Sequence, residues 1–438
     1  MNLKVCKFGG TSMAEKKTID LVKNIILSDE TRRFVIVSAP GKRFASDIKI
    51  TDLLYECFYE KVRSGSCAVP FARIKKRFYD LVNELELDLD IGYHLDRIQE
   101  EIDKSATPDF AASRGEYLSA LITSEILGME FIDAAEIIKF TAKGVFDAET
   151  TNDIVSHRLS LVKGAVIPGF YGAMPDGSIK TFSRGGSDFT GAIIARGVMA
   201  DVYENWTDVD GFMTTDPRIV KDPLLIDVLS YEELRELSYM GASVLHPESI
   251  FPLQGTEIPI NIRNTFNPSS KGTLIVKDTS VKEGRLVTGI AGRKGFTTIL
   301  IKKSMMNAQI GFCRQVLSVL ENYHISLEHM PTGIDTMSLI IPDSDLEQGM
   351  EFELVSKIRG KVNPDSIFVY KDISLIAVVG HGMSHQTGTA AKVFTALAKA
   401  DVNVKMIDQG SSELNIIIGV NTSDFEKAIA AIYGAFFG

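Results

Sequence analysis

Two pairs of adjacent glycines in this sequence stand beside charged and hydroxyl side chains that could handle an anion. The first pair, Gly9 and Gly10, lies in KFGGTSMAE (7–15), with Lys7 just ahead of it. Glycine costs backbone entropy, so a glycine pair suggests that something needs the bare backbone there. A strand-to-helix turn of this type presents backbone N–H groups and the positive end of a helix dipole, which suits phosphate. The spacing is not that of a Walker A loop, and a tight structural turn would explain the pattern equally well.

The second pair, Gly185 and Gly186, lies in FSRGGSDFTGAIIA (182–195), at the start of an apolar helical pattern. Arg184 carries a planar guanidinium that can hold a carboxylate through two hydrogen bonds. Asp188 could instead be the N-cap of the helix. Arginine, two glycines, serine and aspartate in succession exceed what a cap requires, so this stretch predicts a second anion site.

Two other polar stretches could complete a binding site. In WTDVDGFMTTDPR (206–218), Thr207 and Asp208 could hold a base and a ribose, and Arg218 could reach phosphates. An ordinary connecting loop is the alternative. In SRGEYLSA, Glu116 stands at a predicted helix start, where it could meet an ammonium group. An exposed glutamate that is favourable to the helix dipole is the alternative there.

The elements around these stretches alternate between strands and helices. Ser12, with Glu15 three residues on, forms a capping-box pattern for the helix after the first strand. Helical patterns follow at 51–62, 71–85 and 113–127, and the apolar strand patterns are LKVCKF, RFVIVSAP, MEFIDA, GAVIPGFYG, SIKTF, ADVYENW and IPINIRN. Such alternation predicts a mainly parallel sheet covered by helices on both faces. In these sheets ligands bind at the carboxyl ends of the strands, where the glycine turns lie.

The pattern changes near residues 277–283, and two copies of a small α+β unit follow. In the first copy we expect a helix at 308–322 and a strand at ISLEHM (325–330). The second copy, from residue 374, lacks its last strand, which RLVTGIAGR (285–293) could supply. We therefore expect the first unit to be inserted in the second, although one irregular domain is the alternative. The expected domains are 1–284 and 285–438, the latter divided into 297–372 and 285–296 plus 373–438.

Composition narrows the classes of function. The chain has 438 residues, 45% hydrophobic and 24% charged, which indicates about two or three globular domains. A formal net charge of -10 argues against a general nucleic-acid binder. No basic region followed by an apolar one begins the chain, and no apolar stretch approaches the ~18 residues of a membrane helix. Four scattered cysteines favour buried free thiols in a reducing compartment: Cys6, Cys57, Cys67 and Cys313. We expect a cytoplasmic protein that binds neither nucleic acid nor membrane.

This chain resembles aspartate kinases of the amino-acid kinase family through the motifs KFGGTS, SRGEYLSA, GFYG, FSRGGSDFTGA, WTDVDGFMTTDPR, GASVLHP and IRNTFNPSSKGTLI. Its C-terminal repeats look like ACT domains, so the resemblance covers essentially the whole chain. It implies an α/β fold with a mainly parallel sheet sandwiched by helices, followed by two ferredoxin-like α+β ACT domains, one inserted in the other. No fused homoserine dehydrogenase is expected, because the chain ends with the second repeat.

The reaction that the resemblance implies moves the γ-phosphoryl group of ATP to the side-chain carboxylate of L-aspartate. The product is 4-phospho-L-aspartate, and the reaction is the first step of lysine, threonine and methionine biosynthesis. An aspartate side chain with a pKa near ~4 is already ionised at neutral pH. The nucleophile therefore needs no general base, in keeping with the lack of a persuasive Ser/His/Asp or Cys/His grouping.

Residue roles follow from the family motifs as the resemblance implies them. Lys7 would hold the phosphates and stabilise the transferring group, and Asp188 would orient Lys7. The implied phosphate-binding set is Lys7, Gly9, Gly10, Thr11, Ser12, Gly185 and Gly186. The implied aspartate-binding set is Thr51, Glu116, Arg184, Ser187 and Asp188. The implied nucleotide-binding set is Thr207, Asp208, Met213 and Arg218. ATP would come with Mg²⁺, for which the sequence shows no dedicated ligand cage.

The resemblance also implies an amino-acid effector in the first repeat, with lysine expected. The implied effector contacts are Met306, Gln309, Gly311, Phe312, Ser326, Leu327 and Glu328. Such sites commonly lie between ACT domains of two subunits, which implies a homodimer or a larger homo-oligomer. Two departures from relatives, Met213 in place of a tyrosine and Ser243 in place of a lysine, leave a non-catalytic amino-acid sensor as an alternative. A kinase acting on acetylglutamate or glutamate is the other alternative.

Overall fold

The structure is a computed structural model, and it describes residues 2–438 except 105–106, 184, 243, 279–284 and 348. Its contacts divide the chain into two compact units. The first unit comprises Met1–Phe212, Leu225–Tyr231 and Val244–Asp278, and the second comprises Met213–Leu224, Glu232–Ser243 and Thr279–Gly438. The division is therefore interleaved, whereas the sequence suggested a single boundary after residue 284.

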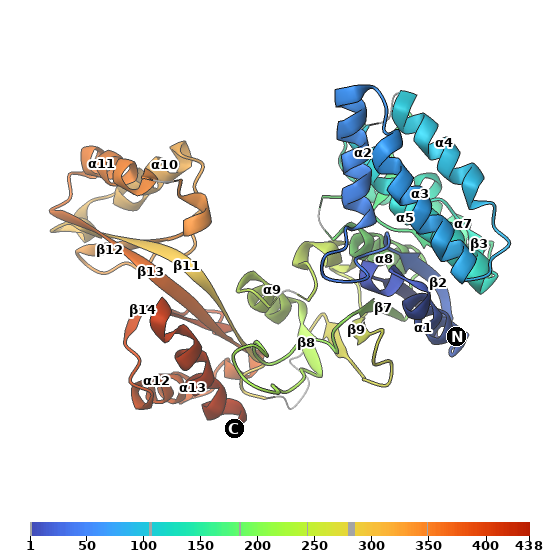
Figure 1. The fold of residues 1–438 in the computed structure, drawn as a ribbon. Helices are drawn as coiled ribbons and strands as arrows, with labels where there is room; N and C mark the ends of the chain where they lie inside the picture. The colour runs from blue at the N-terminus through green and yellow to red at the C-terminus, as the bar shows by residue number, and fades with distance from the viewer. Residues whose placement is uncertain (1, 105–106, 184, 243, 279–284, 348) are drawn as a thin grey trace. The chain divides into compact units, whose positions relative to one another are not determined.

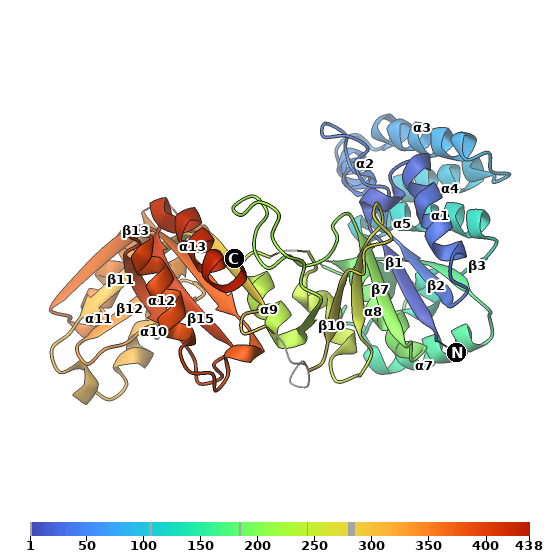
Figure 2. The ribbon, with the colours of Figure 1, turned by 90° about the horizontal axis from the view of Figure 1, so that it is seen from below.

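The first unit is built on an eight-stranded sheet with the order β3-β4-β2-β1-β7-β9-β10-β8. Its strands are β1 (Lys4–Phe8), β2 (Arg32–Val37), β3 (Glu130–Phe131), β4 (Ala165–Pro168), β7 (Val202–Thr207), β8 (Val228–Ser230), β9 (Ile260–Asn264) and β10 (Thr273–Val276). Every pair except β9–β10 is parallel, which confirms the predicted sheet. Figure 2 shows β1 between β2 and β7, and its residues Val5, Cys6 and Phe8 are fully buried. Such a continuous apolar run is typical of a strand buried on both faces.

Helices cover this sheet. They are α1 (Lys16–Leu27), α2 (Ile50–Ser64), α3 (Ala68–Glu84), α4 (Ile91–Lys104), α5 (Pro108–Leu127), α6 (Ala134–Ile137), α7 (Ala148–Ser160) and α8 (Gly186–Gly197), with a hairpin of β5 (Tyr171–Ala173) and β6 (Ile179–Thr181). Helices α5 and α8 pack against the sheet, and α2, α3 and α4 form a helical group with α5 (Figure 1). The predicted helices at 51–62, 71–85 and 113–127 are confirmed as α2, α3 and α5, whereas α4 and α7 were not predicted. Helix α5 begins five residues earlier than predicted, at Pro108, so the prediction that Glu116 stands at a helix start is wrong, and Glu116 lies in the middle of the helix.

The predicted capping box at Ser12 is wrong. The chain first makes a 3-10 turn at Gly10–Met13, and α1 begins only at Lys16 with Glu15 as its N-cap. The backbone N–H of Glu15 donates to Thr18 Oγ1 at 3.3 Å. The Ser12 hydroxyl is buried and lies 2.8 Å from Thr265 Oγ1, so it is not available to cap a helix.

A buried charged cluster ties the central strands together below the glycine turn. The Glu204 carboxylate on β7 accepts hydrogen bonds from Arg32 Nε at 2.8 Å and from Trp206 Nε1 at 3.0 Å. The guanidinium groups of Arg32 and Arg263 lie 5.3 and 4.6 Å from the Trp206 ring centroid. The backbone carbonyl of Trp206 in turn accepts from the N–H of Gly9 at 3.1 Å. The cluster therefore holds Trp206, whose carbonyl fixes the position of Gly9 through this hydrogen bond.

The second unit contains a five-stranded antiparallel sheet with the order β12-β11-β13-β15-β14. Its elements are β11 (Gly289–Lys302), α10 (Phe312–Asn322), β12 (Thr336–Pro342), α11 (Met350–Val362), β13 (Ser366–Val379), α12 (Thr389–Lys399), β14 (Val404–Asp408), β15 (Asn415–Asn421) and α13 (Phe425–Phe437). Figure 1 shows α10 and α11 together at one end of the sheet and α12 and α13 together at the other. The two pairs of helices belong to the two predicted repeats.

The two repeats share their long strands. The first part of β11 pairs with the last part of β13, from Gly289 opposite Val379 onward, and its last part pairs with the first part of β13, up to Lys302 opposite Ser366. Ile290 packs in the core of the second repeat, whereas Ile299 packs in the core of the first. The segment before residue 296 thus supplies a strand to the second repeat, as expected for an insertion.

Helix α9 (Tyr231–Tyr239) explains why the division between the units is interleaved. Within the second unit, Glu236 on α9 accepts from Asn415 Nδ2 at 2.6 Å. The hydroxyl of Tyr239, at the end of the helix, donates to Glu328 Oε2 at 2.9 Å. Contacts of α9 with both repeats place residues 232–243 in the second unit.

Two smaller expectations need correction. The predicted strand at 325–330 is an extended segment with a single bridge between His329 and Ile340, not a regular strand. The expectation of buried thiols is confirmed for three cysteines but is wrong for Cys313, which is exposed on α10. In the part of the chain that the structure describes, no helix combines the length and apolarity needed to cross a membrane.

Candidate active site

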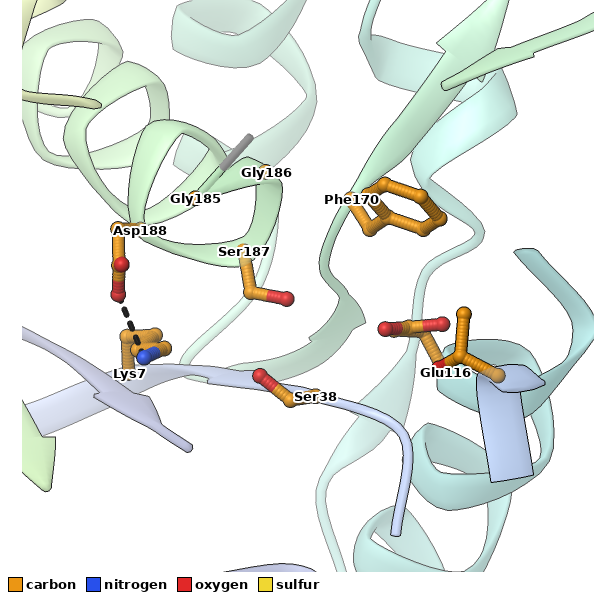
Figure 3. Close-up of a pocket in the computed structure, with 9 residues that line it drawn as sticks. Lys7, Ser38, Glu116, Phe170, Gly185, Gly186, Ser187 and Asp188 are labelled. Atoms are coloured by element: carbon orange, nitrogen blue, oxygen red, sulfur yellow. Dashed lines mark ion pairs between the residues drawn. The ribbon is translucent and has the colours of Figure 1, made fainter. Parts of the chain in front are cut away.

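A cavity of about 220 Å³ in the first unit collects most of the predicted catalytic and aspartate-binding residues (Figure 3). It is lined by Lys7, Ser38, Thr51, Glu116, Phe170, Gly185, Gly186, Ser187 and Asp188. All of these were predicted from the sequence except Ser38 and Phe170. The residues come from β1, the end of β2, the start of α2, α5, the end of β4 and the start of α8. The cavity therefore lies at the carboxyl ends of parallel strands, where such sheets bind their ligands.

The ammonium of Lys7 and the carboxylate of Asp188 form an ion pair at this cavity, with 2.5 Å between Nζ and Oδ1. Gly185, with a φ of 59°, occupies the N-cap position of α8, so Asp188 is not the N-cap. The Asp188 carboxylate also accepts from Asn205 Nδ2 at 2.9 Å, and Asn205 is the neighbour of Lys7 in the β1–β7 ladder. Both side chains are thus held by the central strands, and together they join β1 to α8.

The glycines of both pairs permit close approaches of backbone and side chain. A Cβ on Gly10 would lie 2.9 Å from the Ala39 carbonyl oxygen, and a Cβ on Gly186 would lie 2.5 Å from the Phe170 ring. Real Cβ atoms do not reach such distances, so both positions require glycine. The segment after β2 consequently rests on the first pair, and the Phe170 ring rests on the second.

Two of the predicted phosphate contacts are engaged elsewhere. The N–H of Gly9 donates to the Trp206 carbonyl, and the Ser12 hydroxyl pairs with Thr265. The sequence motif could not reveal this, because both partners lie about two hundred or more residues away along the chain.

Glu116 is a buried acid of the cavity. It is only 5% exposed, and Figure 3 shows its carboxylate directed into the pocket. Burial raises the pKa of Glu116 to about 8, against the opposing effect of a hydrogen bond from the backbone of Ala39. Its Oε2 atom is buried and has no hydrogen-bond partner among the described residues. A buried carboxylate oxygen without a partner is a suitable acceptor for an ammonium group.

Sequence reasoning missed Ser38 and Phe170. Ser38 directly follows β2, near the end of the predicted strand RFVIVSAP, and its N–H donates to the Phe8 carbonyl at 3.1 Å. Its position at a strand end was the available signal. Phe170 has a φ of 82°, which is strained for a residue other than glycine. The flanking glycines of GFYG hinted at an unusual backbone there, although they did not identify the phenylalanine.

The predicted nucleotide residues fall in two units. In the first unit, Asp208 lies 3.4 Å from Thr11 Oγ1 and 3.3 Å from Thr207 Oγ1, so these three polar residues meet beside the first glycine pair. Met213 and Arg218 belong to the second unit, where Arg218 is exposed and its guanidinium forms an ion pair with Asp216 at 2.7 Å. Arg184 and Ser243 lie outside the described residues.

The donor set in the first unit fits a magnesium ion that arrives with a nucleotide. Among the described residues, no group of three histidine, cysteine, aspartate or glutamate side chains forms a metal cage. Magnesium commonly binds through substrate phosphates and only one or two carboxylates. Asp188, at the mouth of the cavity, is the residue that would supply such a carboxylate.

In the second unit, the predicted effector residues divide into a buried and an exposed set. Met306 and Phe312 are buried, and Leu327 packs against the same core. Gln309 and Ser326 are exposed. The side chain of Glu328 is 1% exposed, and its Oε2 accepts from Tyr239 at 2.9 Å and from Arg293 at 3.4 Å. Its other oxygen, Oε1, is buried and has no partner among the described residues.

Comparisons with known proteins agree on one family. The amino acid kinase family model matches residues 2–264, and an ACT domain model matches residues 376–436. Aspartokinase 3 of Bacillus subtilis is 37% identical over 452 residues, which cover 99% of both chains.

Solved structures give the same result. The aspartate kinase of Clostridium acetobutylicum is 50% identical, with a TM-score of 0.93 and full coverage of both chains. E. coli aspartokinase III, solved in complex with aspartate and ADP, is 26% identical with a TM-score of 0.76 and full coverage of both chains. The same E. coli enzyme in complex with lysine and aspartate gives a TM-score of 0.77. The fold that holds the Lys7–Asp188 ion pair is thus that of solved aspartate kinases. This chain is a member of the aspartate kinases of the amino acid kinase family, with C-terminal ACT domains.

Proposed function

We propose that this aspartate kinase transfers the γ-phosphoryl group of ATP to the side-chain carboxylate of L-aspartate, giving 4-phospho-L-aspartate. The reaction would be the cytoplasmic first step of lysine, threonine and methionine biosynthesis. The observation that carries the proposal is one cavity that Lys7, Asp188 and Glu116 line together with the second glycine pair, Gly185 and Gly186. The related E. coli enzyme was solved with aspartate and ADP, which supports the same two substrates here.

The main obstacle to this reaction is electrostatic. The acceptor carboxylate is an anion that must approach the polyanionic end of ATP. Each pair of like unit charges 4 Å apart repels by ~4 kcal/mol at an effective dielectric constant near 20. Lys7 brings a positive charge to the point of transfer, and Asp188 and Asn205 hold that charge in place. Catalysis then consists of positioning and charge neutralisation, as expected for phosphoryl transfer.

The acceptor pocket recognises aspartate through the α-ammonium and the α-carboxylate of the free amino acid. The unpartnered carboxylate oxygen of Glu116 accepts the α-ammonium, and Arg184, which follows the described Ser183, holds the α-carboxylate. Thr51 and Ser187 line the same cavity and complete the polar surface. With both backbone groups held, the side-chain carboxylate is directed to the Lys7 side of the pocket.

The nucleotide is held by polar residues beside the first glycine pair. Thr207 and Asp208 bind the base and ribose in the first unit. The assignment of Met213 and Arg218 to the nucleotide is a prediction from the family motif alone. Magnesium, when bound, neutralises the β- and γ-phosphates. The chain contributes Asp188 to the shell of the ion and Lys7 to the phosphates.

Regulation by an amino acid, with lysine as the expected effector, is assigned to the first ACT repeat. The buried and unpartnered Oε1 atom of Glu328 supports this assignment, because it is an acceptor for an amino group of the effector. The E. coli relative was solved with lysine. Effector binding changes activity only if the effector prefers one of two conformations of the enzyme.

A homodimer or larger homo-oligomer is proposed through this repeat. Met305, Ile310 and Ile334 beside the predicted effector loop are all exposed, Ile310 to 98%. The N–H of Asn307 donates to the Ile334 carbonyl at 3.2 Å, so the two segments are adjacent. Exposed apolar side chains gathered in one place favour burial against a second copy of the chain.

The proposed acceptor is tested with a coupled kinase assay on the wild-type enzyme. Aspartate should be phosphorylated, and glutamate should give a kcat/KM lower by about 10²-fold, because one extra methylene misplaces its carboxylate. For N-acetylglutamate, kcat/KM should be lower by about 10⁴-fold, because this compound lacks the ammonium group and leaves Glu116 unpaired. Equal turnover of glutamate and aspartate, or no aspartate-dependent turnover, would contradict the proposal.

The Glu116 carboxylate makes aspartate binding depend on pH. Its pKa of about 8 in the empty pocket means that the neutral acid dominates at lower pH, whereas only the ionised form pairs with an ammonium. We expect the KM for aspartate to fall by up to about tenfold per pH unit as the pH rises toward 8. Glu116→Gln should raise this KM and remove its pH dependence, while Glu125→Gln, at an exposed site on the same helix, should leave both unchanged. A pH-dependent KM that persists in Glu116→Gln would show that another group titrates.

Glu328 is tested through inhibition of the enzyme by lysine. Glu328→Gln should raise the half-inhibitory concentration of lysine by about tenfold or more, because a neutral amide oxygen binds an ammonium group more weakly than a carboxylate does. The matched control is Glu353→Gln, since Glu353 also accepts a tyrosine hydroxyl, that of Tyr323 at 2.6 Å. Unchanged inhibition of Glu328→Gln would place the effector elsewhere, and an uninhibited wild type would exclude lysine.

A further inference from the structure

One buried guanidinium outside the cavity contacts the backbone that forms both halves of the site. Arg77 lies on α3 and is only 7% exposed. Its Nη2 donates to the Gly41 carbonyl, its Nη1 donates to the Ile48 carbonyl at 2.9 Å, and Nη1 also lies 3.3 Å from Asp47 Oδ2. Arg77 therefore binds both ends of the polar loop that connects β2 to α2.

The first end of this loop rests on the phosphate side of the site. The N–H of Gly41 donates to the Gly10 carbonyl at 2.8 Å. A Cβ on Gly41 would lie 2.7 Å from the Gly10 carbonyl carbon, so the two backbones are in direct contact. The position of Gly41, which Arg77 holds through its carbonyl, therefore determines the position of the first glycine pair.

The other end of the loop leads to the acceptor pocket. Ile48 lies three residues before Thr51, and the N–H of Ile50 donates to the Pro40 carbonyl at 3.3 Å. A Cβ on Gly115, the neighbour of Glu116, would lie 3.1 Å from Ile50 Cγ2. The start of α2 is thus packed between the loop and the glutamate that we assign to the ammonium of aspartate.

We propose that Arg77 is a positioning residue that sets the distance between the phosphate corner and the acceptor pocket. The proposal rests on the function assigned above to these two subsites. A planar guanidinium suits the task, because it donates to two carbonyls in fixed directions while it faces a carboxylate. A lysine ammonium has no such fork. Among the described residues, the arginine within the loop, Arg43, contacts only neighbours in the same loop: its Nε lies 2.8 Å from Asp47 Oδ2, and its guanidinium lies over the Phe44 ring.

The test measures the steady-state constants of full-length Arg77→Met and Arg77→Lys with both substrates. We expect Arg77→Met to lower kcat/KM by about 10²-fold, which is the usual effect of a displacement of about 1 Å. The KM values for ATP and aspartate should rise together, and Arg77→Lys should give an intermediate result. Arg73→Met, one turn earlier on α3 at an exposed site 3.3 Å from Glu56, is the matched control and should retain wild-type constants.

A purely structural role predicts a different result. Loss of folded enzyme lowers the apparent kcat and leaves both KM values unchanged, so the KM values separate the two roles. The proposal would be overturned if the folded fraction of Arg77→Met or of Arg77→Lys had wild-type KM values for both ATP and aspartate. If Arg77→Met does not fold, Arg77→Lys alone decides. Lack of aspartate-dependent turnover in the wild type would instead refute the proposed function.

Discussion

The ion pair between Lys7 and Asp188 is the interaction on which the catalytic arrangement depends. Phosphorylation of a carboxylate brings an anion to a polyanion, so a positive charge must be held at the point of transfer. In the proposed mechanism Lys7, on the central buried strand β1, supplies that charge, and Asp188 in the first turn of α8 holds Lys7 through the ion pair. The pair therefore links β1, which leads into the first glycine pair, to α8, which begins at the second.

Close backbone contacts keep that site rigid. Gly10 admits the segment after β2, Gly186 admits the Phe170 ring, and Gly41 admits Gly10 itself. Any side chain at these positions would force apart the segments that touch there, and at Gly186 one of those segments carries Phe170, which lines the cavity. These three glycines thus serve as points of close contact between neighbouring segments.

Local sequence patterns predicted the parallel sheet and the paired repeats, because strand ends and glycine turns leave a local signature. Together with the family resemblance, which alone pointed to Thr51, they predicted seven of the nine cavity residues. They failed where the hydrogen-bond partner of a residue lies far away in the sequence. The Ser12 hydroxyl forms a hydrogen bond with Thr265 and so does not cap the helix, and the N–H of Gly9 donates to the Trp206 carbonyl. Arg77 lies in an ordinary helical pattern, and only the fold brings it to Gly41. Motifs identify the residues that carry chemistry, whereas the residues that position them depend on contacts far apart in the chain.

A double-mutant cycle in kcat/KM between Lys7→Met and Asp188→Asn tests the central claim most directly. If the two side chains act as one unit across the cavity, the double variant should be no slower than Lys7→Met alone, and the coupling energy should be large. If the losses of the two single variants simply multiply in the double variant, the side chains act independently, and the proposed dependence of the catalytic arrangement on this ion pair would be wrong.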